Sequence, residues 1–287
     1  MATNEFYIKS GNLVSESEWI EIIESLRTDE VIEDKQKAKF IVKEAVIEAV
    51  KKRIPDERFG VLFSGGVDSS LIALICKQLK AAFTCYTVGL ENSSDVEQAK
   101  KVAEFFDFKL KTRILSIEEA EKIIKKAVET VGPNVVKVGV ASVVIAAKEI
   151  ADEKIFFSGL GSEEIFAGYE RHLKAKDVNE ECWNGLKQMR ERDLTRDVAV
   201  AKAMNFELRT PFLDKELIRV AMQLPGRFKL NKDNKLILRE AAEEIGLGDF
   251  AWRKKKAAQY GSRFDKAIEK LAKREKLSKS EYLKKLF

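Results

Sequence analysis

Two adjacent glycines, flanked by hydroxyl side chains and a carboxylate, carry the clearest chemical signal in this sequence. Residues 59–71 read Phe-Gly-Val-Leu-Phe-Ser-Gly-Gly-Val-Asp-Ser-Ser-Leu, so an apolar run breaks at the glycine pair and a helix-periodic run follows. Glycines let backbone N–H groups converge at such a turn, and the new helix adds unpaired N–H donors and the positive end of its dipole. The turn therefore suits phosphate or pyrophosphate, with hydroxyl donors from Ser64, Ser69 and Ser70.

The carboxylate in this turn indicates a cation. Asp68 would be repelled by bare phosphate, but it could hold a divalent cation that the phosphates share. The simpler alternative is an ordinary strand-to-helix turn with an Asp or Ser cap. A lone glycine pair would favour that alternative, whereas the full Ser-Gly-Gly-x-Asp-Ser-Ser pattern after an apolar strand favours an anion site.

A second glycine turn follows a later apolar strand. Residues 158–169 read Ser-Gly-Leu-Gly-Ser-Glu-Glu-Ile-Phe-Ala-Gly-Tyr, which places Glu163 and Glu164 in the first turn of a helix. Acidic side chains there can simply complement the helix dipole. If both turns lie on one edge of a sheet, however, Glu163 faces Asp68 across a crevice, and the pair could hold a divalent cation that bridges a polyphosphate.

Alternating strands and helices are expected to position the two turns. The pattern predicts strands at 59–63, 83–88, 109–114 and 154–157 and helices at 68–79, 93–106, 116–130 and 138–151. Such alternation is typical of an α/β fold with a doubly wound, parallel, five-stranded type of sheet, whose ligands bind beyond the carboxyl ends of the strands. Beyond residue 168 the sequence predicts a helical C-terminal part, with helices near 177–203, 214–223, 235–245 and 263–275.

The first 34 residues are predicted to form a helical N-terminal extension, and residues 35–287 the main domain. The extension has no catalytic motif, and residue 2 is Ala, so we expect no glutamine-hydrolysing domain with an N-terminal cysteine nucleophile. Packing or dimerisation is the expected role of the extension, and a homodimer is a reasonable prediction.

Composition limits the class of protein. Of the 287 residues 45% are hydrophobic and 34% charged, which indicates a globular chain. The net charge of +5 fits a polyphosphate substrate without requiring nucleic acid. Three cysteines with no C-x-x-C spacing predict neither a disulfide framework nor a zinc site, which suits a reducing cytoplasm. No apolar run has membrane-spanning length.

The first turn resembles the pyrophosphate-binding loop of the N-type ATP pyrophosphatases. The chain as a whole resembles the synthetase domain of the class B asparagine synthetases and their β-lactam synthetase relatives, in a stand-alone, divergent form without the glutaminase domain. The matching runs span about residues 35–270; they are 60–70, 86–90, 158–169, 199–214 and 252–255, with Gly261 downstream. The resemblance implies an adenine nucleotide α-hydrolase-like fold, and an AMP-forming ligase that adenylates a carboxylate, with aspartate favoured, and passes it to ammonia or another amine donor.

The resemblance also implies roles for particular residues, with ATP and Mg²⁺ as cofactors. Lys255 would stabilise the charge that builds on the phosphates, and Glu164 is expected to be a second catalytic side chain. Asp68 and Glu163 would ligate magnesium. The residues expected to bind the nucleotide are Leu62, Ser64, Gly65, Gly66, Asp68, Ser69, Ser70, Val88, Ser158 and Gly159.

Two departures from the family pattern keep other functions open. Leu160 stands where asparagine synthetases carry an acid, and leucine cannot move a proton. Glu163 replaces a shorter aspartate. A nucleotide-binding pseudoenzyme or assembly subunit is therefore one alternative, and a PP-loop enzyme of RNA modification that uses the basic run 252–256 is another. Elsewhere, we expect His172 at the surface, and Arg209 and Asp214 as a structural ion pair.

Overall fold

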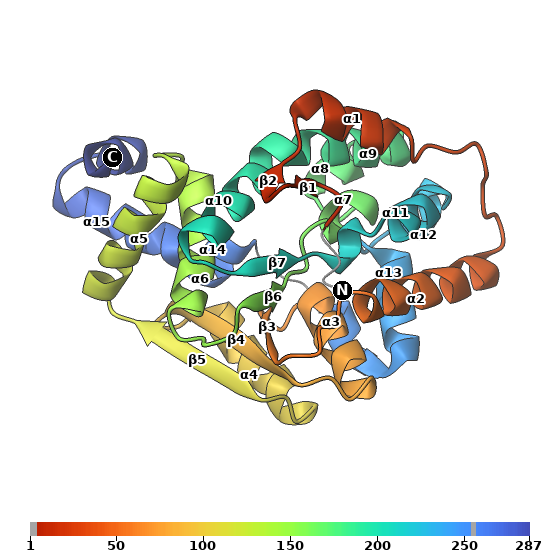
Figure 1. Ribbon diagram of the computed structural model, residues 1–287, viewed down its shortest axis with the longest axis horizontal. Helices are drawn as coiled ribbons and strands as arrows, with labels where there is room; N and C mark the ends of the chain where they lie inside the picture. Colours follow the sequence, from red (N-terminus) through yellow and green to blue (C-terminus); the bar gives the residue numbers. More distant parts are fainter. Residues whose placement is uncertain (1–4, 254–256) are drawn as a thin grey trace.

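A parallel five-stranded sheet forms the centre of the molecule (Figure 1). The computed structural model describes residues 5–253 and 257–287. The strands lie in the order β5-β4-β3-β6-β7, with bounds β3 Phe59–Leu62, β4 Phe83–Leu90, β5 Leu110–Leu115, β6 Ile155–Phe157 and β7 Glu207–Arg209. The predicted doubly wound α/β fold is confirmed. β7 was not expected as a strand.

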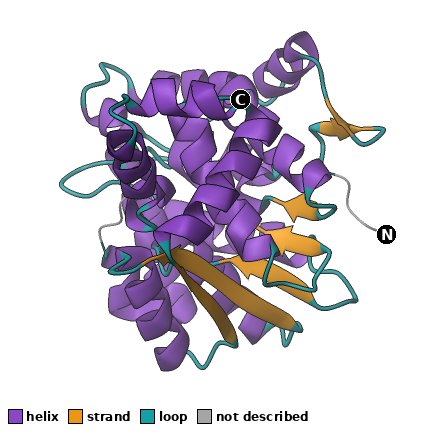
Figure 2. Ribbon diagram, turned by 90° about the vertical axis from the view of Figure 1, so that its left-hand side faces the viewer, coloured by secondary structure: helices purple, strands orange, loops and turns teal. Residues whose placement is uncertain are grey.

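Helices cover both faces of the sheet. Successive residues of a strand point to opposite faces, so each strand contributes apolar side chains to two hydrophobic cores. Phe157 of β6 belongs to one hydrophobic core and Phe156 to the other. The first core is shared with α2 (Lys35–Lys51) and α3 (Val67–Gln78), and the second with α5 (Ile117–Val131) and α6 (Val135–Lys148). In Figure 2 the strands run across the lower right of the molecule, with helices packed above and to the left of them. The sheet edge is thus the place where ligands can reach the strand ends.

The C-terminal part is helical, as expected. The predicted helix 177–203 is a continuous pair of helices joined by a π-helical turn at Arg190–Leu194. The remaining elements are α4 Ser94–Phe105, α7 Ser162–Ile165, α8 Glu170–Leu173, α9 Val178–Met189, α10 Thr195–Ala203, a 3-10 turn Pro211–Leu213, α11 Lys215–Met222, α12 Gly226–Lys229, α13 Leu236–Ala242, a second π turn Glu243–Leu247, a second 3-10 turn Gly248–Trp252, α14 Ala258–Gly261, α15 Phe264–Arg274 and α16 Lys279–Leu286.

The N-terminal segment packs against the main domain. It contains a short hairpin, β1 Ile8–Lys9 and β2 Asn12–Leu13, which was not expected, followed by α1 Glu16–Glu24. Trp19 is buried, and its indole N–H donates to the carbonyl oxygen of Leu186 at 3.0 Å. The hairpin is joined to the π turn by the Arg190 Nε to Val14 O hydrogen bond of 2.7 Å. The division of the chain at residue 34 stays a prediction.

The helices of the described residues were not expected to include a membrane span. None of them is by itself long and apolar enough to span a bilayer. Among these helices, the one pair that together has the length and apolar composition, α5 with α6, is bent by 116°.

Cys76, Cys85 and Cys182 are free thiols buried in the protein.

Candidate active site

The first glycine turn joins β3 to α3 at the carboxyl end of the central strand. Gly65 has φ +67°, and a Cβ there would come within 2.9 Å of the backbone nitrogen of Ala99. Glycine is therefore required both by backbone conformation and by space. The turn is held by Ser69, whose hydroxyl accepts the N–H of Ser64 at 3.3 Å. The predicted strand, turn and helix are confirmed here.

The second glycine turn lies against the first. β3 and β6 are neighbours in parallel register, Val61 opposite Phe157, so both strands end at the same edge of the sheet. A Cβ on Gly159 would lie 2.8 Å from the Cβ of Asp68, so only glycine allows the turns to approach this closely. The prediction of two turns on one rim is confirmed.

A buried ammonium group sits between the two predicted metal ligands. The Nζ atom of Lys235 lies 2.8 Å from Asp68 Oδ2 and 2.8 Å from Glu163 Oε1, and it also donates to the Ser162 hydroxyl at 2.8 Å. Burial alone would lower the pKa of Lys235, but the two carboxylates outweigh burial and raise it. The structure thus brings Asp68 and Glu163 together around a single positive charge.

Lys235 was not predicted. Its partner Asp68 is 167 positions away in the chain, so no local sequence pattern predicts the contact. The only available signal was that Lys235 stands at the start of a predicted helix. In the structure it directly precedes α13 with φ +56°, in the left-handed region.

The donor set fits magnesium only with help from a ligand. The described residues contain no group of three or more His, Cys, Asp or Glu side chains that could hold a metal alone. Mg²⁺ commonly binds through one or two carboxylates together with substrate phosphates, and Asp68 and Glu163 supply such a pair. Space for this pair depends on Gly168, because a Cβ there would lie 1.6 Å from Glu163 Oε2.

Glu164 is buried beside this pair. It accepts hydrogen bonds from the Tyr169 hydroxyl at 3.0 Å and from Arg192 Nη2 at 2.5 Å. Its second oxygen has no hydrogen-bond partner among the described residues. Burial, then the nearby Asp193, raises the pKa of Glu164 to about 7 against the opposing pull of Arg192. The side chain can therefore change protonation state near neutral pH.

A paired acid–base cluster lies on the π turn and α10. Arg192 bonds Asp193 at 2.6 Å, and Arg196 bonds Asp193 at 3.0 Å and Asp197 at 2.6 Å. Burial raises the pKa of Asp197, and the attraction of Arg196 opposes that rise. The guanidinium groups of Arg192 and Arg196 thus form ion pairs with carboxylates of the same chain.

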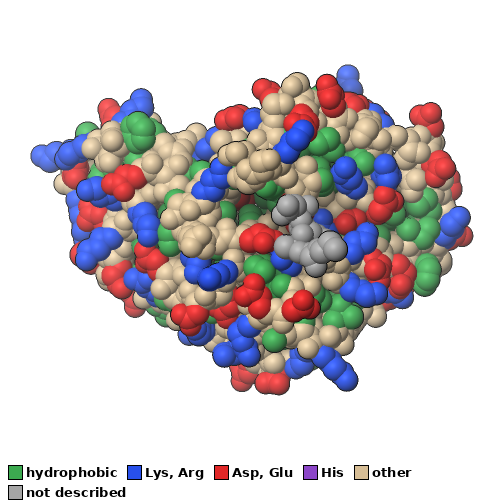
Figure 3. All heavy atoms as spheres, in the orientation of Figure 1, with side chains coloured by type: hydrophobic (Ala, Val, Ile, Leu, Met, Phe, Trp, Pro, Cys, Tyr) green, Lys and Arg blue, Asp and Glu red, His purple; other side chains and the backbone are tan. Residues whose placement is uncertain are grey.

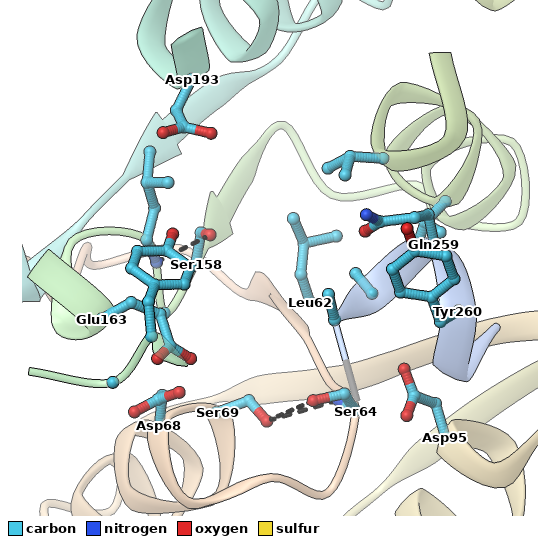
Figure 4. A pocket seen from close by; sticks show the side chains of 18 of the residues that line it. Leu62, Ser64, Asp68, Ser69, Asp95, Ser158, Glu163, Asp193, Gln259 and Tyr260 are labelled. Atoms are coloured by element: carbon cyan, nitrogen blue, oxygen red, sulfur yellow. Dashed lines mark hydrogen bonds between the residues drawn. The ribbon is translucent and has the colours of Figure 1, made fainter. Parts of the chain in front are cut away.

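The Asp68, Glu163 and Lys235 group and the cluster on the π turn and α10 line one cleft of about 1190 Å³. Figure 3 shows this face of the molecule hollowed near its centre, and Figure 4 shows Asp68, Ser69, Ser64, Glu163 and Ser158 around the hollow. The predicted site residues that line the cleft are Leu62, Ser64, Asp68, Ser69, Val88, Ser158, Gly159 and Glu163.

Other predicted site residues lie elsewhere. Ser70 is fully buried and its hydroxyl has no partner among the described residues. Gly65 and Gly66 shape the turn behind the cleft, and Glu164 reaches the cleft through Arg192 and Tyr169, which do line it. Lys255, predicted to be catalytic, lies outside the described residues.

Two expectations from the sequence were wrong. His172 is not at the surface: it is completely buried, its Nδ1 accepts the N–H of Tyr169 at 3.0 Å, and burial lowers its pKa to about 4. Arg209 and Asp214 do not pair with each other. Asp214 instead bonds Arg53 at 3.0 Å, while Arg209 bonds Glu207 at 2.7 Å.

Comparison with known proteins identifies the family. The asparagine synthase family model matches residues 41–179 and 173–287. The chain is 31% identical, over 85% of its length, to the putative glutamine-hydrolyzing asparagine synthetase 1 of Methanocaldococcus jannaschii, and 33% identical, over 74%, to the glutamine-hydrolyzing asparagine synthetase of Rattus norvegicus. The NMN synthetase structure from Francisella tularensis aligns over 85% of this chain and 97% of its own, at 14% identity and a TM-score of 0.33.

The matches cover only part of the curated relatives. The chain spans 53% of the archaeal relative's length and 41% of the rat protein's. The matched segments nevertheless include both glycine turns, Lys235 and the cluster on α10. On this evidence the chain belongs to the asparagine synthase family.

Proposed function

We propose that this protein is an AMP-forming, ATP-dependent ligase that adenylates a carboxylate and transfers it to a nitrogen nucleophile. The observation that carries the proposal is the convergence of Asp68, Glu163 and Lys235 where two glycine turns meet at one sheet edge. The relatives are named glutamine-hydrolyzing asparagine synthetases, and we take aspartate and ammonia as the reference substrates of the proposal.

The reaction has two displacement steps. A carboxylate oxygen of the substrate attacks the α-phosphorus of ATP, the bond to the bridging oxygen breaks, and pyrophosphate leaves with the electron pair. The nitrogen of the amine then attacks the acyl carbon, AMP leaves with the electron pair of the acyl–oxygen bond, and the nitrogen loses a proton. Atoms and charge balance without any oxidant or reductant.

Different residues of the cleft would bind the adenosine and the pyrophosphate portion of ATP. Leu62, the last residue of β3, and Val88, near the end of β4, would contact the adenosine, as would Ser158 and Gly159. The backbone N–H groups of the first turn and the start of α3 would bind the pyrophosphate portion, since a helix N-terminus favours anions. Ser70 would support this turn from behind.

Positive charge is needed where pyrophosphate departs. Mg²⁺ held by Asp68 and Glu163 would neutralise charge on the phosphate oxygens. Lys235, which contacts both carboxylates, would donate to the same phosphate oxygens. Lys255 would reach the α-phosphate or the pyrophosphate oxygens, as the family resemblance implies.

Glu164 would act as a positioning residue. It holds Arg192 and Tyr169, which line the cleft, and its raised pKa lets it take up a proton near neutral pH. The second step releases a proton from the incoming nitrogen, and this network reaches the cleft through Arg192 and Tyr169.

The test is ATP–pyrophosphate exchange with a panel of amino acids and other carboxylates, with and without ammonium. We expect exchange that requires both a carboxylate and Mg²⁺ and that falls at least about a hundredfold in Asp68→Ala and Lys255→Ala, as for the loss of a charge-stabilising group. Asp249→Ala, an exposed position outside the cleft, is the control. Wild-type exchange in both site variants would overturn the assignment.

A second candidate is a nucleotide-binding protein without chemistry. Leu160 favours it, because this side chain lines the cleft at the position where an acid would serve the reaction. That reading predicts ATP binding but no exchange with any carboxylate. Salt-sensitive binding of tRNA, measured in the same series, would instead support an RNA-modifying enzyme.

The cysteines bear on the cellular compartment of the proposed enzyme. The three buried free thiols suit a reducing compartment, so we propose a cytoplasmic enzyme. A homodimer through the N-terminal segment stays a prediction, which sedimentation would test.

A further inference from the structure

One guanidinium group of the cleft has an N–H donor without a protein partner. Arg253 lines the cleft and is partly buried. Its Nη1 atom is shielded from solvent and has no hydrogen-bond partner among the described residues. A donor that has lost water without gaining an acceptor is unfavourable. The side chain is therefore suited to a ligand that brings acceptor oxygens.

The charge of Arg253 is also not used by the described part of the chain. Burial lowers the pKa of Arg253, while the charges of Asp95 and Glu97 act to raise it. Neither carboxylate forms an ion pair with Arg253 in the residues that the structure describes. The carboxylate of Asp95 lies against α14 instead, since a Cβ on Gly261 would come 2.1 Å from Asp95 Oδ1. The guanidinium thus keeps its positive charge available to the cleft.

The backbone around this guanidinium is held in place. Arg239, on α13, donates to the carbonyl oxygen of Ala251 at 2.5 Å and to that of Arg253 at 3.1 Å. The indole N–H of Trp252 donates to Glu243 Oε2 at 3.0 Å. Arg253 is therefore anchored at its own carbonyl group and at the two residues before it. Its position at the cleft is set by α13 and the second π turn.

Arg253 lies on the side of the cleft where the first glycine turn is. Asp95 and Glu97, the carboxylates whose charges act on it, belong to the first turn of α4. This helix packs directly against the glycine turn, because a Cβ on Gly65 would come within 2.9 Å of the α4 backbone. Figure 4 shows Asp95 on the same side of the hollow as Ser64. The guanidinium is thus placed beside the turn proposed to bind pyrophosphate.

A polyphosphate at this turn needs positive charge beyond that of Lys235. Asp68 and Glu163 share Lys235, so these three groups together remain net negative. Arg239 lines the cleft as well, and its hydrogen bonds end on carbonyl and amide oxygens, which are neutral. Arg239 and Arg253 therefore bring positive charge to the cleft that their hydrogen bonds to described residues do not neutralise.

We propose that Arg253 is a direct ligand of the β- and γ-phosphates of ATP, and hence a further catalytic residue of the reaction. This inference rests on the proposed adenylation function. The guanidinium would donate paired hydrogen bonds to the phosphate oxygens, as arginine does in bidentate phosphate recognition. When the bond between the α-phosphorus and the bridging oxygen breaks, the electron pair passes to pyrophosphate, and Arg253 stabilises that charge. Arg239 is a positioning residue, because it acts through the carbonyl group of Arg253.

The experiment measures binding of ATP, pyrophosphate and AMP, each with Mg²⁺, by isothermal titration calorimetry. Arg253→Gln should weaken ATP and pyrophosphate at least about tenfold, the size expected for loss of a hydrogen bond between charged groups. AMP has neither a β- nor a γ-phosphate, so its affinity should not change. Arg253→Lys keeps the charge but not the planar fork, so its affinity for pyrophosphate should be intermediate.

Arg58→Gln is the matched control. Arg58 is exposed and lies outside the cleft, so the variant removes the same charge without touching the site. It should bind all three ligands as the wild type does. Thermal unfolding of each variant confirms that it is folded. In ATP–pyrophosphate exchange, Arg253→Gln should raise KM for ATP and leave KM for the carboxylate unchanged.

The outcomes separate this inference from the ligase function. An equal loss of AMP and ATP affinity in Arg253→Gln would overturn the phosphate contact, as would unchanged pyrophosphate affinity. Unchanged nucleotide binding with a raised KM for the carboxylate would assign Arg253 to the second substrate. Pyrophosphate binding that depends on Arg253, without exchange for any carboxylate, would overturn the ligase function and leave the phosphate contact standing. Absence of ATP binding by the wild type would overturn both.

Discussion

The Nζ atom of Lys235 lies 2.9 Å and 2.8 Å from the two carboxylate oxygens of Asp68, although 167 positions separate the residues in the chain. This contact joins the start of α13 to the first glycine turn. It also places a protein cation between the proposed Mg²⁺ ligands, so Lys235 neutralises one of the two negative charges of Asp68 and Glu163.

Removal of that cation should destabilise the fold and make it responsive to Mg²⁺. Lys235→Met removes the ammonium group that Asp68 and Glu163 share, and breaking a buried pair costs about 3 kcal/mol, the lower end of the usual range because Glu163 is partly exposed. Urea unfolding should show this loss, and millimolar Mg²⁺ should restore part of it. Lys266→Met, which removes an exposed pair with Glu269, should have little effect.

The double variant tests the cause of that loss. Lys235→Met combined with Asp68→Asn removes the repulsion, so it should be more stable than Lys235→Met alone and insensitive to Mg²⁺. A double variant as unstable as the sum of the two single variants would contradict the electrostatic explanation.

His172 should make the protein sensitive to acid. Its pKa is about 4 in the folded protein, against an ordinary value of about 6.5, so between these values the unfolded chain binds a proton that the folded chain does not. Stability is therefore lost as pH falls from about 6.5 to 4, by about 2 kcal/mol between pH 7 and 4.5 at 1.36 kcal/mol per unit.

His172→Asn isolates this contribution. The Asn carbonyl can still accept the N–H of Tyr169, but it does not titrate. Urea unfolding at pH 7, 5.5 and 4.5 should show a smaller acid loss for the variant than for the wild type. Equal losses would mean that other groups cause the acid sensitivity.

Glu164 should set the pH dependence of the reaction. Its pKa of about 7 predicts an inflection near neutral pH in kcat/KM for exchange. Glu164→Gln keeps the size and hydrogen-bonding capacity of the side chain but not its charge, so activity should fall about tenfold and the inflection should disappear. Glu216→Gln, an exposed residue on α11, should leave the profile unchanged; an inflection that persists in Glu164→Gln would assign it to another group.

Gly168 should be intolerant of any side chain. A Cβ at this position would lie 1.6 Å from Glu163 Oε2 and 2.5 Å from Lys235 Cε, so Gly168→Ala must displace the carboxylate. We expect exchange to fall at least about tenfold and the Mg²⁺ concentration for half-maximal rate to rise. Gly226→Ala, where the nearest atom is 3.0 Å away, should keep a wild-type Mg²⁺ requirement.

Much of the fold and the two turns could be predicted because their signals are local. Apolar runs that end in glycine mark β3 and β6, and helical spacing marks α3 and α6. β7 was missed because its three residues, Glu-Leu-Arg, are too few to show alternation and carry charges at both ends. Only pairing with β6 makes them a strand.

The rest of the site depends on contacts between distant parts of the chain. Nothing near Lys235 indicates that it will meet Asp68, and nothing near His172 indicates that α8 will be covered by α9. The pairing of Arg53 with Asp214, instead of Arg209, is likewise set by the packing of α2 on α11. Such partners are determined by tertiary structure.

The N-terminal hairpin has a mechanical consequence for the cleft. Val14 holds Arg190 by 2.7 Å, and Asn12 holds Lys202 by 2.7 Å, at the two ends of the segment that carries Arg192 and Arg196. The hairpin thus supports the part of the cleft wall that carries Arg192 and Arg196. Proteolytic cleavage within residues 8–13 would remove these two contacts and leave the sheet and the two glycine turns intact. Binding of the acyl substrate should then weaken before binding of ATP does.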